Sequence, residues 1–510
     1  MKTSSTVNSY IKSVLVFCFI AMSMIAFGQK KVDYNLLAQD AAKTSFPMLK
    51  ELLSIPNDAF YPADIEKNVV WCEDAFTKRG FTTQRLPTET VPLLLAERNH
   101  PKAKKTVLIY LQIDGQPVDS TMWFQESPYK PVLKKKIASE WEEIPWESIS
   151  AYEDEWRIFA RSASDAKGPV VMFLAAMDAA ASKNIVPNYN IKVIMDFEEE
   201  LGSPRLPKTV TQNADALKAD MLIIFDGPRH ITNKPTLTFG ARGIATMTLT
   251  TYGPVLPQHS GHFGNYAPNP ALRLAKLLAS MKDDAGRVTI PGFYDGVDIS
   301  AETEKILKAV PDNEAEINKR LQIAEADKVG SYYQESIQYP SLNIRGMQSG
   351  WINEKVRTIV PAWARAELDI RLVKETDPER LLQLVADHVK EQGYYVIDAE
   401  PTEQERLQYP KIASISSEIS YQSFRTEFDS EVGLWLQSAL KRAFNEDAIL
   451  IRMSGGSIPI SPFVNTLGIP AVTVPTVNRD NNQHSPNENL RLGNYREGIK
   501  TMIAILNEPF

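Results

Sequence analysis

The sequence predicts an α/β protein with a mostly parallel sheet and a smaller α+β domain inserted into it. Short apolar runs end abruptly in polar or glycine-containing turns, which is typical of buried parallel strands. Helical patterns lie between these runs, so strand, helix and strand alternate as in open sheets with helices on both faces. The pattern changes between about residues 239 and 408, where a different order of elements indicates a second domain.

The main sheet is expected to use segments from both ends of the chain. Four apolar runs are predicted strands: 106–111, 191–195, 219–225 and 471–475. Helices are expected at 169–183 and 432–445. The polar residues that follow the four strands include Asp114, Glu199, Asp226 and His484. Because ligands of parallel sheets bind beyond the carboxyl ends of the strands, these side chains are expected to meet there.

The inserted domain is expected to be a small, ferredoxin-like α+β unit. Its predicted elements are a strand, a helix, a strand, a helix and a strand: 237–252, 269–282, 364–373, 378–392 and 394–398. We therefore assign residues 239–408 to an inserted domain, and residues 29–238 and 409–510 to the sheet domain. Residues 284–341 are an extra elaboration for which the sequence indicates no role.

Residues 1–28 have the features of a signal peptide. Lys2 and Lys12 form a short basic region, residues 13–27 are apolar, and Gly28 closes a stretch with small residues at the cleavage positions. The apolar run is shorter than the about 20 residues that a membrane-spanning helix needs. We expect export to the periplasm or extracellular space without stable membrane insertion; an uncleaved N-terminal anchor is the alternative.

The charge of the mature chain argues against nucleic acid as a partner, and its cysteine count excludes an internal disulfide. Cleavage would leave 54 of the 56 basic residues against 63 acidic ones, a net charge of −9. An acidic surface of mixed charges argues against a nucleic-acid partner. Of the two cysteines only Cys72 would remain, so an intramolecular disulfide is excluded and the hydrophobic core must provide the stability.

Acids from distant parts of the chain form the most informative pattern. Asp165, Glu199, Glu200 and Asp226 could converge with His484 at one edge of the sheet. Taken singly, each acid could cap a helix or lie on a solvated face. Taken together they would form a carboxylate-rich site, and burying so much negative charge without a cation would be costly. The pattern therefore predicts a site for a divalent metal ion.

Six segments are similar to motifs of the M20-type metallopeptidase family, which includes aminoacylases and carboxypeptidases. These segments are LQIDGQPVD (111–119), RSASDAKG (161–168), EEELGS (198–203), LPQHSGHFG (256–264), SGGSIP (454–459) and HSPNE (484–488). The chain most resembles the dipeptidase, carnosinase-like branch, and the likeness runs from about residue 45 to the C-terminus. It implies that residues 29–238 and 409–510 form a zinc-peptidase-like catalytic domain that binds the metal, and that residues 239–408 form an inserted lid or dimerisation domain.

The resemblance implies a role for each metal-site residue. Asp165 would bridge two divalent ions, Glu200 and His484 would complete one site, and Asp226 would belong to the other. Glu199 would be the general base, which takes a proton from a water activated by the metal and later passes it to the leaving amine.

The resemblance also implies residues that orient the site and bind substrate. Asp114 would orient a metal ligand. His259 of the lid would stabilise the oxyanion, in family members from the neighbouring subunit, which implies a homodimer. The substrate, and in particular its carboxylate, would be held by a further set: Arg371, Asn269, Gly455, Gly456 and Ser457. A structural salt bridge at Arg371 and a plain flexible loop at 455–457 are the alternatives.

The main departure from the family lies at Gln112, where the family has a histidine ligand. Gln112, Asp165 and Asp226 would form an all-oxygen site, which suits manganese, magnesium or calcium better than zinc. This site is therefore expected to hold manganese or to stay empty, while Asp165, Glu200 and His484 retain the three protein ligands of a catalytic zinc site. His230 could substitute for the missing histidine, although a surface histidine is the simpler interpretation.

These observations favour a metal-dependent hydrolase that cleaves the amide bond of dipeptides or N-acyl amino acids. The alternative is a catalytically impaired relative that binds peptides or amino-acid derivatives, because one ligand position is altered. A third interpretation is hydrolysis of another amide or carbamate bond. The substrate side chain is not identified by the sequence.

Overall fold

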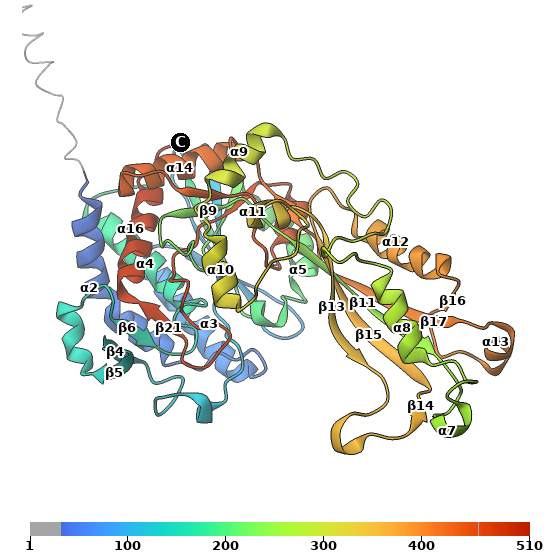
Figure 1. The fold of residues 1–510 in the computed structure, drawn as a ribbon. Coiled ribbons are helices and arrows are strands. Elements are labelled where there is room, and N and C mark those ends of the chain that lie inside the picture. Colours follow the sequence, from blue (N-terminus) through green and yellow to red (C-terminus); the bar gives the residue numbers. More distant parts are fainter. Residues whose placement is uncertain (1–31, 457) are drawn as a thin grey trace, which may run out of the picture.

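A computed structural model describes residues 32–456 and 458–510. The predicted signal peptide and Ser457 lie outside this range. Figure 1 shows a broad domain with helices on both sides of a sheet, and a narrower domain that extends from it. Within the described range, no helix is both long and apolar enough to cross a membrane.

The broad domain is built on a sheet of eight strands among the described residues, in the order β1-β2-β7-β3-β8-β20-β9-β19. The central strands β7, β3, β8 and β20 are parallel, whereas β1 and β2 pair antiparallel at one edge. This arrangement confirms the predicted α/β class. The bounds of the strands are Thr82–Leu86 (β1), Leu93–Arg98 (β2), Thr106–Gln112 (β3), Asn190–Asp196 (β7), Met221–Ile224 (β8), Thr236–Thr238 (β9), Ile449–Ile451 (β19) and Ala471–Thr473 (β20).

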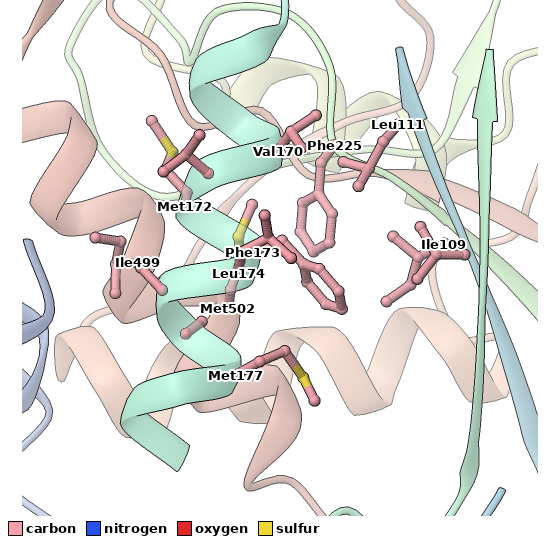
Figure 2. Packing of buried hydrophobic residues seen from close by; sticks show 14 of the residues in the cluster. Ile109, Leu111, Val170, Met172, Phe173, Leu174, Met177, Phe225, Ile499 and Met502 are labelled. Carbon is pink, nitrogen blue, oxygen red and sulfur yellow. The ribbon is translucent and has the colours of Figure 1, made fainter. Parts of the chain in front are cut away.

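The central strands are apolar because both faces of the sheet are covered. Ile109 and Leu111 of β3 pack on one side, against α4 (Lys167–Ser182), as Figure 2 shows. Leu108 and Tyr110 point to the opposite side and pack in a second cluster with α5 (Leu206–Gln212) and α15 (Ser461–Leu467). Successive side chains of a strand alternate between faces, so a strand covered on both sides reads as a continuous apolar run.

Helix α4 is buried on nearly all sides because other helices cover it. It contacts α2 (Tyr34–Leu53) and α16 (Leu492–Leu506), and α16 also contacts α14 (Glu431–Phe444). Figure 2 shows Phe173 of α4 beside Phe225 and the sheet, while Met172 lies toward Ile499 of α16. A helix enclosed in this way needs apolar residues around its whole circumference. The first residues of α4 directly follow Asp165, so this packing fixes one wall of the site.

The narrower domain, here called the lid domain, contains a sheet of five described strands in the order β13-β15-β11-β17-β16. Helices α8 (Pro270–Ala279) and α12 (Pro378–Glu391) pack on one face of it, with Leu277 and Val385 in the shared core. The order of β13, β15, β11 and β17 is that of a ferredoxin-like unit, as predicted. Its strands are Gly243–Tyr252 (β11), Ser341–Gln348 (β13), Trp363–Leu372 (β15), Tyr395–Ile397 (β16) and Ile412–Tyr421 (β17).

The two connections between the domains lie side by side. Strand β10 (Gly240–Ala241) leads into the lid domain and pairs with β18 (Phe424–Arg425), which leads back. Next to them, β9 pairs in parallel with β19. The boundary assigned at residue 408 falls just before β17, which pairs with β11 in the lid sheet.

Residues 301–337 lie over the sheet domain, although they belong in sequence to the lid segment, whereas Val288, Ile290 and Phe293 before them pack in the lid core. Residues 301–337 contain three helices among the described residues: α9 (Ala301–Ala309), α10 (Glu314–Leu321) and α11 (Tyr333–Ser336). Helix α9 contacts β19 of the main sheet. In Figure 1 the three helices, drawn in yellow, lie beside β9 and not beside the lid sheet. We call this part the cover segment.

Candidate active site

Neighbouring strands bring the predicted acids to one edge of the main sheet. Gln112, the last residue of β3, is paired with Asp196, the last residue of β7, and Glu199 and Glu200 follow shortly after. On the other side of β3, the chain reaches Asp226 two residues after the end of β8. All three strands run in the same direction, so their carboxyl ends present Gln112, Glu199 and Asp226 to one cavity.

A buried carboxylate that was not predicted fixes the loop that carries Asp165. Strand β21 (Asn489–Arg491) pairs with β6 (Arg157–Phe159) and places Glu488 against the loop before α4. Glu488 accepts hydrogen bonds from the backbone N–H groups of Ser162, Ser164 and Asp165 at 2.9, 3.0 and 2.9 Å. Arg161 donates to the same carboxylate at 2.8 Å, and both side chains are buried. The backbone of Asp165 is therefore fixed.

Asp165, Glu200 and His484 form a set that fits a metal ion. Nε2 of His484 lies 3.0 Å from a carboxylate oxygen of Asp165 and 3.2 Å from one of Glu200. One ligand atom from each of the three residues lies within 4.8 Å of the other two. Two carboxylates and one imidazole leave a fourth tetrahedral position open, which is the donor set of a catalytic zinc site.

Two glutamines support this set. Gln116 donates from Nε2 to Glu200 at 2.7 Å, and Gln483 donates to Asp165 at 3.3 Å. Neither was predicted, because an amide in a loop carries no sequence signal of its own.

Asp114 holds the two consecutive glutamates in place. Its two carboxylate oxygens accept hydrogen bonds from the backbone N–H groups of Glu199 and Glu200, at 3.0 and 2.9 Å. Asp114 is fully buried, and Glu199 lines the cavity next to Asp165 and Asp226. The side chain of Asp114 therefore acts through the position of Glu199 and Glu200.

The crowded acids raise one another's pKa. Burial and the charges of Asp226 and Asp165 raise the pKa of Glu199 well above its usual range. Burial and Asp165 likewise raise the pKa of Glu200 to about 8 and that of Asp226 to about 7. A hydrogen bond to Asp165 raises the pKa of His484 to about 9. A cation at this place would offset the repulsion among the carboxylates.

The side of the site near Gln112 is different. Gln112 donates from Nε2 to the second oxygen of Asp165 at 2.7 Å, and its Oε1 is buried without a hydrogen-bond partner among the described residues. Asp226 accepts a hydrogen bond from the N–H of Gly227 at 2.7 Å. In this orientation of the amide, an N–H group and not an oxygen faces the Asp165 oxygen that a second ion would share.

His230 does not replace the missing histidine ligand. Its Nε2 donates to Asp312 of the cover segment at 3.1 Å, and its Nδ1 lies 2.9 Å from the hydroxyl of Thr232. Both ring nitrogens therefore have partners away from Asp226.

These residues surround a cavity of about 770 Å³, which is a typical volume for a small-molecule site. Glu199, Asp165, Asp226 and Gln112 line it, and so do Gly455 and Gly456 of the loop after β19. Ser457 lies outside the described residues, so its predicted contact stays a prediction. The cover segment forms another part of the wall, which the sequence did not indicate.

The remaining predicted residues lie on the lid domain and not in the wall of this cavity. His259 is exposed before α7 (Ser260–Phe263), which Figure 1 places at the far end of the lid domain. Asn269 caps α8 by accepting hydrogen bonds from Ala271 and Leu272. Arg371 of β15 lies 3.4 Å from the carboxylate of Asp369. Their predicted roles in binding substrate stay predictions.

A family model for "Peptidase family M20/M25/M40" matches residues 111–508, which is more than half of the chain. The chain belongs to peptidase family M20. The matched range includes every strand end that contributes to the cavity, and it includes the lid domain as well. This agrees with the resemblance found in the sequence motifs.

Characterised relatives and solved structures extend over most of the chain. A Cys-Gly metallodipeptidase, dug1, of Schizosaccharomyces pombe is 27% identical over 428 residues, which cover 82% of each chain. The human Beta-Ala-His dipeptidase is 26% identical and covers 82% of this chain and 77% of its own. Among solved structures, an M20 family metallo-carboxypeptidase of Sulfolobus solfataricus superimposes with a TM-score of 0.73 at 28% identity, covering 91% of this chain and 98% of its own.

Proposed function

We propose that this protein hydrolyses dipeptides with the help of one divalent metal ion, held by Asp165, Glu200 and His484. The observation that carries the proposal is the convergence of these three ligand atoms within 4.8 Å, beside Glu199, in a cavity of about 770 Å³. The dipeptidases among the relatives support a dipeptide as substrate. N-acyl amino acids are a second class with the same scissile amide bond.

A divalent ion bound here would lower the pKa of a water molecule and polarise the carbonyl group of the substrate. Zinc fits the two carboxylates and one imidazole. The amide of Gln112 occupies the other oxygen of Asp165, so we propose that one ion is sufficient and that the place beside Asp226 stays without a second ion.

Glu199 moves the proton in this proposal. Its raised pKa suits a group that accepts a proton from the attacking water and then holds it near neutral pH. After the water oxygen has added to the carbonyl carbon and the carbon–nitrogen bond breaks, Glu199 delivers that proton to the leaving amine. Asp114 fixes the position of Glu199 by accepting hydrogen bonds from the backbone N–H groups of residues 199 and 200.

The decisive experiment replaces Glu199 with glutamine, which keeps the shape but removes the base. We expect turnover of Ala-Ala with zinc to fall by about 10²- to 10⁴-fold, while zinc content stays near one ion per chain. The control is Glu198→Gln, because the carboxylate of Glu198 binds Thr90 and Arg205 instead of the cavity. Full turnover in Glu199→Gln, or its absence in the unaltered zinc-loaded protein, contradicts the proposal. The latter result would favour the non-catalytic, peptide-binding alternative.

We further propose that the protein works as a homodimer in which His259 reaches the site of the neighbouring subunit. In one chain His259 lies at the far end of the lid domain, and large apolar side chains are exposed near it, among them Leu256 at 66% and Tyr266 at 87%. Exposed apolar groups of this kind favour a protein contact. The proposal follows the family resemblance.

Mixing two inactive variants tests this arrangement. A Glu199→Gln subunit supplies an intact His259, and a His259→Ala subunit supplies an intact Glu199. If the subunits exchange, half of the dimers are mixed and each has one complete site, so about a quarter of the normal activity should return. No recovery, although co-purification of two differently tagged subunits shows mixed dimers, contradicts a contribution of His259 across the interface.

The N-terminal residues support one more proposal, export by way of a cleaved signal peptide ending near Gly28. N-terminal sequencing of the protein recovered from the medium or from a periplasmic extract tests it. An intact Met1 in that fraction contradicts cleavage.

A further inference from the structure

The cover segment forms one wall of the substrate cavity. Ile317, Arg320 and Leu321 of α10 all line it, and their spacing of three and four residues places them on one side of the helix. Tyr333 and Gln334, at the start of α11, line the same cavity. A segment that reaches the site from outside the sheet domain is suited to contact the substrate without holding the metal ion.

Hydrogen bonds fix the cover segment to the rim of the metal site. One oxygen of Asp312 accepts a hydrogen bond from His230 at 3.1 Å, and the other accepts one from Gln334 at 2.6 Å. His230 follows Asp226 by four residues, so the link begins at the edge of the sheet itself. Although burial opposes the change, the hydrogen bonds from His230 and Gln334 lower the pKa of Asp312, and the charge of Arg479 adds to this effect.

Two arginines of the cavity wall, Arg320 and Arg479, have no ion-pair partner within hydrogen-bonding distance among the described residues. The other cations of the wall are already paired. Arg229 binds Glu497, and His484 binds Asp165 and Glu200. Asp312, the acid near Arg479, has both oxygens engaged by His230 and Gln334. The cavity therefore offers two guanidinium groups to a ligand.

We propose that the cover segment makes this enzyme selective for dipeptides that carry an acidic side chain in addition to the terminal carboxylate. Arg320 of α10 and Arg479 of the loop after β20 bind that side chain. The inference rests on the proposed function, because it concerns the same cavity. A guanidinium group donates two parallel hydrogen bonds to a carboxylate, whereas an uncharged amide of the same shape accepts only one and carries no charge.

Binding measured without turnover tests the inference separately from catalysis. The zinc-loaded Glu199→Gln protein is titrated with four peptides: Glu-Gly, Gln-Gly, Gly-Glu and Gly-Gln. Each acid differs from its amide partner by one charge and hardly in shape. We expect the acidic member of at least one pair to bind about fivefold tighter or more, and the ratio to decrease with added salt, because the arginines are exposed.

Two further proteins assign the preference to the arginines. The first carries Arg320→Gln and Arg479→Gln together in the Glu199→Gln background. In this protein the ratio of the affinities for the acidic peptide and its amide partner should be close to one. The control is Lys319→Gln, which removes a positive charge from the same helix but does not line the cavity. This control should keep the ratio, and thermal melting of all variants shows that they are folded.

Equal affinity for both members of each pair overturns the inference, and so does a ratio that survives the loss of both arginines. Failure to bind any of the four peptides overturns it as well. The proposed function is decided separately, by turnover in the unaltered zinc-loaded protein of any of five dipeptides, namely Ala-Ala and the four peptides above, so equal affinity for acid and amide leaves it untouched. Conversely, a binding preference for acidic peptides in a protein that cleaves nothing would leave this inference standing.

Discussion

The two halves of the metal site share Asp165 but differ in how they are built. On one side Nε2 of His484 lies close to one oxygen of Asp165 and to one of Glu200. On the other side Gln112 gives an N–H group to the second oxygen. Both halves therefore give Asp165 a hydrogen bond, but the imidazole of His484 becomes a metal ligand when it gives up its proton, whereas the amide nitrogen of Gln112 does not. A single change of ligand type is enough to separate two otherwise neighbouring sites.

The surrounding hydrogen bonds differ in the same way. On the first side, Gln116 donates to Glu200 and Asp114 holds the backbone of residues 199 and 200. On the second side, Asp226 has a hydrogen bond from its own neighbour Gly227, and Oε1 of Gln112 has no partner among the described residues. An ion in the first half would enter a prepared set of ligands. An ion in the second half would require the amide of Gln112 to turn, so that its Oε1 and not its N–H faces the ion.

The largest difference is expected between the variants His484→Ala and Gln112→Ala. Loss of His484 removes one of three ligands, so kcat/KM for Ala-Ala should fall by about a thousandfold or more and the zinc should be lost. Gln112→Ala should retain one zinc ion per chain. Both variants are measured by metal analysis and steady-state kinetics. If they lose zinc equally, the two halves are not distinct.

A smaller effect is expected from Glu488→Gln, which acts on the first half without touching the ion. The variant keeps the shape of the side chain but removes the charge that faces Arg161 and the backbone of Asp165. We expect the zinc affinity to fall by about 10- to 100-fold, as for other groups that orient a ligand. The buried Arg161 would also lose its ionic partner, so the melting temperature should fall. An unchanged zinc affinity, measured by competition with a chelator, contradicts this role.

The change Gln112→His would make the two halves alike. An imidazole can coordinate a second ion together with Asp165 and Asp226, so the metal content should rise from about one to about two ions per chain. Anomalous scattering would locate the added ion beside Asp226. A second ion in the unaltered protein, or none in Gln112→His, contradicts our interpretation of the second half.

The smallest expected effect concerns pH in the metal-free protein. In the folded chain the pKa values of Asp226, Glu200 and His484 are raised to about 7, 8 and 9. A group whose pKa is higher in the folded than in the unfolded chain stabilises the fold fully only when the pH lies below its pKa in the unfolded chain. This contribution to the free energy of unfolding is lost as the pH rises through the pKa in the folded chain. The melting temperature in chelator should therefore fall by about 2 to 6 °C between pH 5 and 9, relative to the zinc-loaded protein. The opposite slope contradicts the assignment.

Much of this architecture follows from the sequence alone. Residues 106–111 and 191–195 are short apolar runs followed by polar residues, and the structure confirms them as parallel strands that meet at one edge. The convergence of Asp165, Glu200 and His484 follows from that edge and from the family motifs. Such features depend on local periodicity and on strand direction, which a sequence carries.

Other features depend on contacts between distant segments. The strand β13 was not predicted, because its residues are mostly exposed and lack an apolar alternation. Nothing near Asp312 indicates that it binds His230, 82 residues away. The orientation of the Gln112 amide depends on its burial next to Asp165. These properties arise only when the tertiary structure has formed.

The neighbouring connections of the lid domain have a consequence for how such proteins can be rebuilt. The outgoing Gly240 is paired with the returning Arg425, so the chain leaves and rejoins the sheet domain at nearly the same point. The segment between these two residues is therefore an insertion whose two ends lie next to each other. We expect that this stretch, which includes the cover segment, can be exchanged between relatives at this junction, which gives a practical route to hybrid proteins with altered cavity walls.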